Sequence, residues 1–242
     1  MIRVVHEGLT SRAEAVASLC RERDAAVTVS ETAALAAGEF DADDRVVALG
    51  ERALLAVGRV GVDAPVLPVG GESLPNSPTL DDLDTVVETV LAADPDVVDH
   101  PILSIGDDSG TERARAVLDV TLVTDEPARI SEYAVRAGDR EIDRFRADGV
   151  VVATPLGSGG YASAVGGPRL GPGTGLAVVP VSPFETQRDY WVVADPVALS
   201  VERDDSAVSL VADDTVVGAV GPEERLTVRP TGTLAVLRPD ES

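Results

Sequence analysis

Apolar residues in the first part of the chain follow two alternating spacings. Contiguous apolar runs typical of strands occur at residues 2–5, 44–50 and 64–69. Apolar residues at helical spacing occur at residues 11–23, 52–60 and 80–93. Ser11 is the candidate cap of the first helix. Strands that alternate with helices predict a parallel α/β layer in this part of the chain.

The pattern changes after residue 101, where short β-rich runs are separated by turns of Gly, Asp and Pro. These runs lie at residues 117–124, 131–138, 149–153, 176–181, 190–195, 197–202, 206–212 and 226–230. They predict an all-β half. The acidic, proline-punctuated residues 93–101 are the expected boundary. We therefore expect an α/β N-terminal domain at 1–95 and an all-β C-terminal domain at 96–242, with a return of the last segment to the first domain left open.

The charge balance is strongly acidic and limits the classes of partner. The chain has 42 acidic and 20 basic residues, for a formal charge of -22, and every basic residue is arginine. An acidic surface repels phosphate backbones, and no basic patch suits a membrane surface, so we expect no nucleic acid and no membrane partner. The composition resembles that of extreme halophiles, because acidic surfaces stay hydrated in salt that screens charges within roughly 3 Å at 1 M.

Scarce reactive residues exclude several chemistries. A single cysteine, Cys20, cannot form an internal disulfide, and with only His6 and His100 beside it no clustered metal site is expected. The absence of lysine excludes Walker-type nucleotide loops, protein-kinase ATP sites and Schiff-base enzymes. The N-terminus has no signal-peptide pattern, and no stretch approaches about 18 apolar residues, so we expect a cytoplasmic protein.

The most informative stretch is glycine-rich and follows an apolar run: residues 149–168 read GVVVATPLGSGGYASAVGGP. Residues 157–162 match the G-x-G-x-x-A fingerprint of dinucleotide-binding Rossmann folds. A Rossmann crossover needs a helix of about ten residues or more. Gly166, Gly167 and Pro168 end the helix here after a turn or two, which argues against that fold.

Two interpretations of the glycine-rich turn remain open from its spacing. In the first, glycines bring the backbone close to a ligand, a short helix near Ser158 presents its N–H groups, and Tyr161 stacks on a ring. In the second, the same residues form a tight structural turn. Spacing alone favours neither.

Residues 146–168, RADGVVVATPLGSGGYASAVGGP, resemble the signature of the NAD kinase family, usually written ADGxxVxTPTGSTAYxxSAGGP. The register is unbroken over this stretch. LAVVPVSPF at residues 176–184 resembles the family's LTPICPH segment, and AVLDV at residues 116–120 resembles its ALNEV or ALNDV motif. The likeness covers most of the β half and implies the family's architecture of an α/β domain followed by a β domain.

The resemblance implies transfer of a phosphoryl group from ATP or polyphosphate, with Mg2+, to the ribose 2′-hydroxyl of NAD, giving NADP. The family has GGDG after a strand of its first domain, and Leu49-Gly50-Glu51-Arg52 stands there in this chain. Glu51 replaces the aspartate expected to act as base. One extra bond shifts its carboxylate by roughly 1.5 Å, and misplacement by about an ångström can cost a hundredfold in rate.

The other loop positions carry further implications. Gly50 and Arg52 would lie against the phosphates, where Arg52 could serve as a substitute cation. A positive φ at Arg52 would be strained, because its side chain has replaced a glycine.

In the second half, the resemblance implies that the dinucleotide is held by Asp119, Asp148, Thr154, Gly157, Ser158 and Tyr161. The family's asparagine beside the first of these is Leu118 here, which offers no polar contact. Structural roles stay open as alternatives: Glu51 as a solvated helix start, Asp119 as a turn cap, Tyr161 as a core residue.

Three functions therefore compete. The first is an NAD kinase adapted to salt, with Glu51 as base, whose activity through the altered loop is retained, reduced or lost. The alternative is a non-catalytic, nucleotide-binding regulatory protein on the same scaffold. A kinase for another acceptor is least favoured, because lipid kinases share the GGDG-type first domain but this chain lacks a basic membrane patch. Family members assemble as dimers or tetramers, so the resemblance also implies a homo-oligomer.

Overall fold

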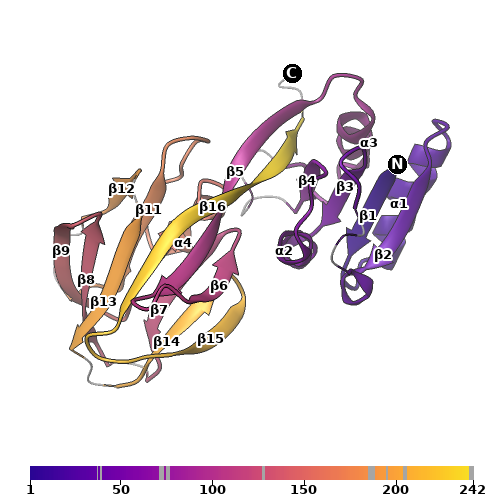
Figure 1. The fold of residues 1–242 in the computed structure, drawn as a ribbon. Helices are drawn as coiled ribbons and strands as arrows, with labels where there is room; N and C mark the ends of the chain where they lie inside the picture. The colour runs from indigo at the N-terminus through magenta and orange to yellow at the C-terminus, as the bar shows by residue number, and fades with distance from the viewer. Residues whose placement is uncertain are drawn as a thin grey trace. The chain divides into compact units, whose positions relative to one another are not determined.

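The computed structural model describes residues 1–36, 38, 40–70, 74, 77–126, 129–184, 189–194, 196–203 and 206–239. The chain forms two compact units (Figure 1). One combines Met1–His100 with Leu234–Ser242, and the other is Pro101–Thr233. The two division points fall inside strands β5 (Asp96–Asp107) and β16 (Arg225–Arg238).

The first unit is built on a parallel sheet. Its strands are β1 (Ile2–His6), β2 (Val27–Glu31), β3 (Arg45–Leu49) and β4 (Val66–Val69). β1 lies between β2 and β3, and β3 pairs with β4, all in parallel. The end of β16 continues this sheet, with Val236 opposite Val66. The parallel α/β layer expected from the sequence is confirmed.

Helices cover this sheet. They are α1 (Thr10–Arg21), α2 (Glu51–Val60) and α3 (Leu83–Leu91), and a short 3-10 turn, η1 (Thr32–Ala34), follows β2. Apolar residues of α1 and α3 pack with alternate strand residues such as Val4 and Val47. α1 begins before Ser11, and Leu9 occupies its cap position without a side-chain bond, so the predicted Ser11 cap is wrong. No helix in the described part of the chain is long and apolar enough to span a membrane.

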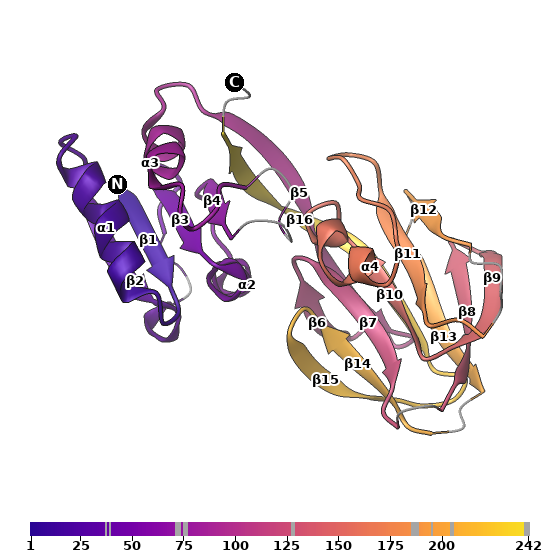
Figure 2. The same ribbon diagram turned by 180° about the vertical axis from the view of Figure 1, so that it is seen from behind.

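The second unit consists of two antiparallel sheets, seen from both sides in Figures 1 and 2. Its remaining strands are β6 (Glu112–Ala116), β7 (Asp119–Thr124), β8 (Ser131–Ala137), β9 (Arg140–Ala147), β10 (Gly149–Ala153), β11 (Leu176–Val181), β12 (Trp191–Val193), β13 (Val197–Arg203), β14 (Val208–Ala212) and β15 (Thr215–Val220). One sheet has the order β12-β11-β10-β7-β14-β15. In the other, β13 lies between β16 and β8, β8 pairs with β9, and β5 pairs with β6.

A single apolar cluster fills the space between these two sheets. It takes Leu122 and Val150 from the six-stranded sheet and Tyr133 and Leu199 from the other, all fully buried or nearly so. Alternate residues of each strand therefore face this core. The all-β half expected from the sequence is confirmed, and with it the two-part fold class.

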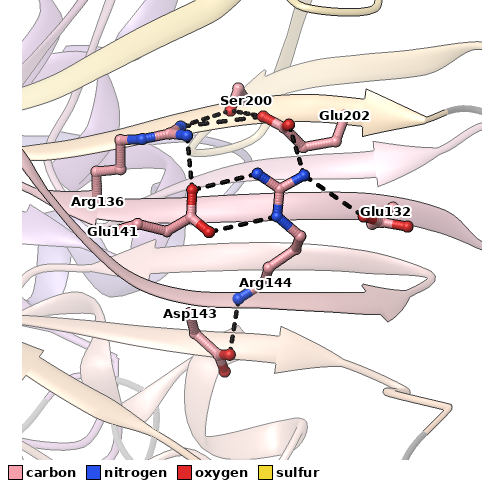
Figure 3. A network of polar contacts seen from close by, with 7 residues as sticks. All are labelled: Glu132, Arg136, Glu141, Asp143, Arg144, Ser200 and Glu202. Carbon is pink, nitrogen blue, oxygen red and sulfur yellow. Dashed lines mark hydrogen bonds and ion pairs between the residues drawn. The ribbon is translucent and has the colours of Figure 1, made fainter.

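The outer face of β8, β9 and β13 is polar (Figure 3). Arg144 lies 2.7 Å from Glu202 and 3.2 Å from Glu141, and Arg136 lies 2.6 Å from Glu141. Ser200 donates to Glu202 at 2.6 Å. These residues alternate with core residues, so the charged positions of β9 satisfy one another on the side away from the core.

Five strands were absent from the sequence-based expectation: β2, β5, β6, β9 and β15. Among the described residues, four of them, β2, β6, β9 and β15, pair with a neighbour on one side only, whereas β5 pairs with both β6 and β16. Edge strands bury little surface, and most positions in these four are exposed or half-buried. Residues 93–101, the expected boundary, belong largely to β5. An apolar run therefore detects fully buried central strands more readily than strands with few buried positions, although edge strand β12 was also predicted.

Candidate functional site

Thr154 organises the turn that follows β10. Its N–H donates to the Leu118 carbonyl at 2.9 Å, and its hydroxyl donates to the Val117 carbonyl at 2.9 Å. The same hydroxyl accepts the Gly157 N–H at 3.1 Å. Because Thr154 is fully buried, its polar groups need these partners. Thr154 thus ties the turn to the residues just before β7.

Gly157 and Ser158 are committed to the same turn. A Cβ at Gly157 would lie 2.1 Å from the Leu118 carbonyl oxygen, so only glycine fits. The fully buried Ser158 hydroxyl donates to the Pro155 carbonyl and accepts the Leu170 N–H, both at 2.8 Å. Sequence reasoning predicted ligand contact for these residues. The structure places them in internal contacts of the turn.

The helix after the turn is short, as the glycines predicted. The 3-10 turn η2 (Gly157–Gly159) leads into α4 (Tyr161–Ala164), which packs on β10 and β11 through Ala162, the side of β10 opposite the main core. β10 and β11 are antiparallel. A βαβ crossover requires parallel strands, so the G-x-G-x-x-A match is not a Rossmann loop.

Three predicted ligand residues lie at the ends of β10 or directly after the turn that follows it. Asp119 begins β7 opposite Ala153, the last residue of β10. Asp148 precedes the other end of β10, where its backbone N–H donates to the Val181 carbonyl at 3.0 Å. Tyr161 begins α4 and is 44% exposed. Burial raises the pKa of Tyr161, and the charges of Asp119 and Asp148 raise it further.

Sequence reasoning missed Asp213, in the two-residue turn between β14 and β15. Its carboxylate accepts the backbone N–H groups of Val117, Leu118 and Asp119 at 2.7–3.2 Å. The adjacent acidic pair Asp213-Asp214 indicates a turn between strands. No feature of the sequence indicates which backbone the first carboxylate reaches.

The remaining predicted residues belong to the first unit, at the carboxyl ends of β1 and β3. Leu49 ends β3 and is buried in the core. Gly50 has φ +87°, a conformation that favours glycine, and its N–H donates to the Val69 carbonyl at 2.7 Å. Glu51 is the exposed first residue of α2, where the helix dipole favours a carboxylate.

Arg52 is held by an acidic neighbour. Its guanidinium lies 2.8 Å from the Glu7 carboxylate, on the loop between β1 and α1. Arg52 lies inside α2 and has no positive φ, so the strain expected at this position is absent. The sheet order changes direction between β1 and β3, and the loops after these two strands mark a switch point, a common ligand position in parallel sheets. Glu7 was not predicted from the sequence.

A family model and curated relatives resemble part of this chain. The family model of the ATP-NAD kinase C-terminal domain matches residues 118–235. The NAD kinase of Methanosarcina barkeri is 42% identical over 79 residues, and that of Archaeoglobus fulgidus is 34% identical over 107 residues. These segments cover 32% and 44% of this chain and only 29% and 39% of the two relatives.

Solved structures resemble the fold over nearly the whole chain. An Archaeoglobus fulgidus NAD kinase in complex with ATP aligns with a TM-score of 0.73 at 21% identity, covering 99% of this chain and 94% of its own. Yeast NADH kinase complexed with NADH aligns with a TM-score of 0.76 at 16% identity, covering 99% and 83%. The matched β domain, the signature-like stretch at residues 146–168 and the shared fold agree, and together they support membership of the NAD kinase family.

Proposed function

We propose that this protein binds NAD and transfers the terminal phosphoryl group of ATP or polyphosphate to the ribose 2′-hydroxyl, giving NADP. The observation that carries the proposal is the exposed Tyr161 at the start of α4, directly after the glycine-rich turn, with Asp119 opposite the last residue of β10 and Asp148 before its first residue. An exposed aromatic ring and carboxylates near the two ends of the same strand suit a ligand with flat rings and several hydroxyl donors. The structures of relatives hold ATP and NADH, which supports a nucleotide ligand.

Each residue of this group has its own role in the proposal. Tyr161 stacks against a ring of the dinucleotide. Asp119 and Asp148 accept hydrogen bonds from ribose hydroxyl or adenine amine groups. Thr154, Gly157 and Ser158 act indirectly, because their polar groups and close contacts build the turn that carries Tyr161.

Phosphoryl transfer requires a base and neutralised charge. We assign the base to Glu51: its carboxylate takes the 2′-hydroxyl proton as the oxygen bonds to the terminal phosphorus, and ADP or shortened polyphosphate leaves. The N-terminus of α2 at Gly50 and Arg52 favours phosphate oxygens. The described residues contain no group of three or more His, Cys, Asp or Glu side chains that could hold a metal. Mg2+ bound with the phosphoryl donor would supply the charge neutralisation.

A non-catalytic nucleotide-binding protein is the second candidate, and the Glu7–Arg52 ion pair favours it. An arginine neutralised by a carboxylate at 2.8 Å has less charge to offer a phosphate. Leu118 adds to this, because its buried side chain offers no polar contact beside Asp119. A protein of this kind would hold the dinucleotide and leave it unchanged.

An end-point assay separates the two candidates. Purified protein is incubated in molar potassium chloride with Mg2+, NAD and either ATP or polyphosphate, and NADP is detected with a coupled dehydrogenase. Glu51→Ala removes the proposed base, and Asp84→Ala is the matched control, since Asp84 is an acidic residue in the first turn of α3. NADP that is lost only in Glu51→Ala supports the kinase.

The same experiments identify a protein that binds NAD without phosphorylating it. Absence of NADP with every donor, together with thermal stabilisation by NAD, supports the binding protein. A ligand present at about a hundred times its dissociation constant adds about 2.7 kcal/mol to the stability, which a melting curve detects readily. Absence of both NADP and stabilisation contradicts the proposed function.

A further inference from the structure

Asp213 forms an unusually complete set of bonds with a backbone segment far away in the sequence. It is the first residue of the two-residue turn closed by Ala212 and Thr215. Its carboxylate accepts the Val117 N–H at 3.0 and 3.1 Å, the Leu118 N–H at 2.7 Å and the Asp119 N–H at 3.2 Å. Its own N–H donates to the Asp119 carbonyl at 2.9 Å. Three successive N–H groups that converge on one carboxylate form an anion-binding nest.

The turn that carries Asp213 is shaped for this contact. Asp213 has φ +52°, in the left-handed region that aspartate tolerates better than most residues. Such a conformation persists when surrounding contacts determine it. The four hydrogen bonds to residues 117–119 are contacts of that kind. The hairpin thus holds the backbone at the start of β7 in place through hydrogen bonds.

The same backbone segment is held from a second direction by the glycine-rich turn. The Leu118 carbonyl accepts both the N–H and the hydroxyl of Thr154, at 2.9 and 3.1 Å. Gly157 packs directly on the Leu118 backbone. Residues 117–119 are therefore fixed between the β14–β15 hairpin and the turn. The direction in which Asp119 leaves the backbone depends on both.

We propose that Asp213 is a positioning residue for the dinucleotide: by filling the nest of residues 117–119, it orients the Asp119 carboxylate toward the ligand beside Tyr161. The inference rests on the proposed function, because it needs a dinucleotide that Asp119 contacts. It predicts that the side chain of Asp213 affects NAD binding without contacting NAD. It also predicts that the effect passes through Asp119.

Variants of the hairpin test the proposal. Asp213→Gly keeps the left-handed turn and removes the carboxylate, and Asp213→Asn keeps one acceptor oxygen. Asp214→Asn is the matched control, because it makes the same change of charge in the same turn, where Asp214 accepts a bond from Thr215. The dissociation constant for NAD is measured by isothermal titration calorimetry in molar potassium chloride, well below each melting temperature.

We expect Asp213→Gly to weaken NAD binding about tenfold, Asp213→Asn to weaken it less, and Asp214→Asn to change it less than twofold. The decisive comparison is a double-mutant cycle. In an Asp119→Asn background, Asp213→Gly should weaken binding less than twofold further, because the group it positions is already altered. A general loss of structure would instead weaken binding equally in both backgrounds.

The outcomes are distinguishable. Wild-type protein that binds neither NAD nor NADH overturns the proposed function, and the positioning role with it. Wild-type protein that binds NAD while Asp213→Gly binds equally well overturns the positioning role alone. A tenfold loss that persists in the Asp119→Asn background shows that Asp213 acts by another route and also overturns the inference.

Discussion

In the turn after β10, the retained signature residues Thr154, Gly157 and Ser158 make hydrogen bonds and close contacts within the protein itself. In the loop after β3, the changed residues Glu51 and Arg52 lie exposed at the start of a helix. The first region is constrained by folding at nearly every position. The second can change its chemistry with little effect on the fold.

This difference changes how the family signature is read. Retention of three buried turn residues is explained by the fold, since each has a backbone partner or a close contact. Information about a ligand lies in residues that the turn does not need, above all the exposed Tyr161. The loop after β3 holds the proposed catalytic residue, and there the Arg52 guanidinium is already paired with the Glu7 carboxylate.

The largest expected effect tests the constrained region. Gly157→Ala places a Cβ 2.1 Å from the Leu118 carbonyl oxygen, and its three nearest atoms all belong to the Leu118 backbone, which cannot yield easily. We expect a loss of about 3 kcal/mol in the free energy of unfolding, the upper part of the range for overpacked sites. Urea denaturation in molar potassium chloride measures it.

Gly160→Ala is the matched control for this substitution. The nearest atom to its Cβ would be the Gly157 carbonyl oxygen at 3.4 Å, an ordinary contact, and its φ is negative. We expect a change within about 1 kcal/mol. Equal losses in the two variants would show that close packing on Leu118 is not why this glycine is retained.

The next largest effect tests the loop after β3, which can change its residues with little effect on the fold. Glu51→Asp combined with Arg52→Gly restores the last two residues of GGDG while leaving the buried Leu49 in the core. If the loop limits catalysis, NADP formation should rise about tenfold or more, since an ångström of misplacement can cost about a hundredfold. The glycine should cost the helix no more than about 1 kcal/mol.

Arg59→Gly with Glu51 unchanged is the control, because Arg59 lies in the last turn of the same helix. It should leave NADP formation as in the wild type while making a similar change to α2. An unchanged rate in the restored loop, with both proteins folded, would mean that these two residues are not what limits activity.

The same comparison explains what sequence reasoning reached. Central strands such as β3, β7 and β10 were predicted because both of their faces are buried and their sequences read as apolar runs. Edge strand β9 was missed because its outward residues are the charged groups of the ion-pair network (Figure 3). The charged residues of β9 alternate as they do because they pair with charged residues of the neighbouring strands.

Candidate site residues were predicted where a local motif contains them and were missed where they act through a distant partner. The motif located Asp119, Asp148 and Tyr161, whose proximity arises within one short stretch and its paired strand. Asp213 and Glu7 escaped detection because each acts through a partner at least 45 residues away. A contact across that distance depends on tertiary packing, which no local spacing encodes. Their own neighbourhoods show only an ordinary turn and an ordinary loop.

The smallest expected effect asks whether the carboxylates of Asp119 and Asp148 interact electrostatically with the Tyr161 phenol. Burial first, and then the charges of Asp119 and Asp148, raise the pKa of Tyr161. A raised pKa in the folded state means that the stability contribution is complete below the ordinary tyrosine value of about 10 and is lost as the pH rises through the folded value. Asp119→Asn should lower the pKa of Tyr161 and so shift its ionisation to lower pH. Phenolate absorbance against pH measures this shift.

Two features of the chain make this titration specific. Tyr133 also has a raised pKa, caused mainly by burial and partly by Asp148 and Asp125, but Asp119 is not among the charges that act on it. A difference between wild type and Asp119→Asn that disappears in a Tyr161→Phe background therefore reports on Tyr161. Asp214→Asn removes the same charge from the neighbouring hairpin and should leave the curve unchanged. Identical curves for wild type and Asp119→Asn would separate Asp119 from Tyr161 and leave the turn with structural contacts as the only explanation for its retained residues.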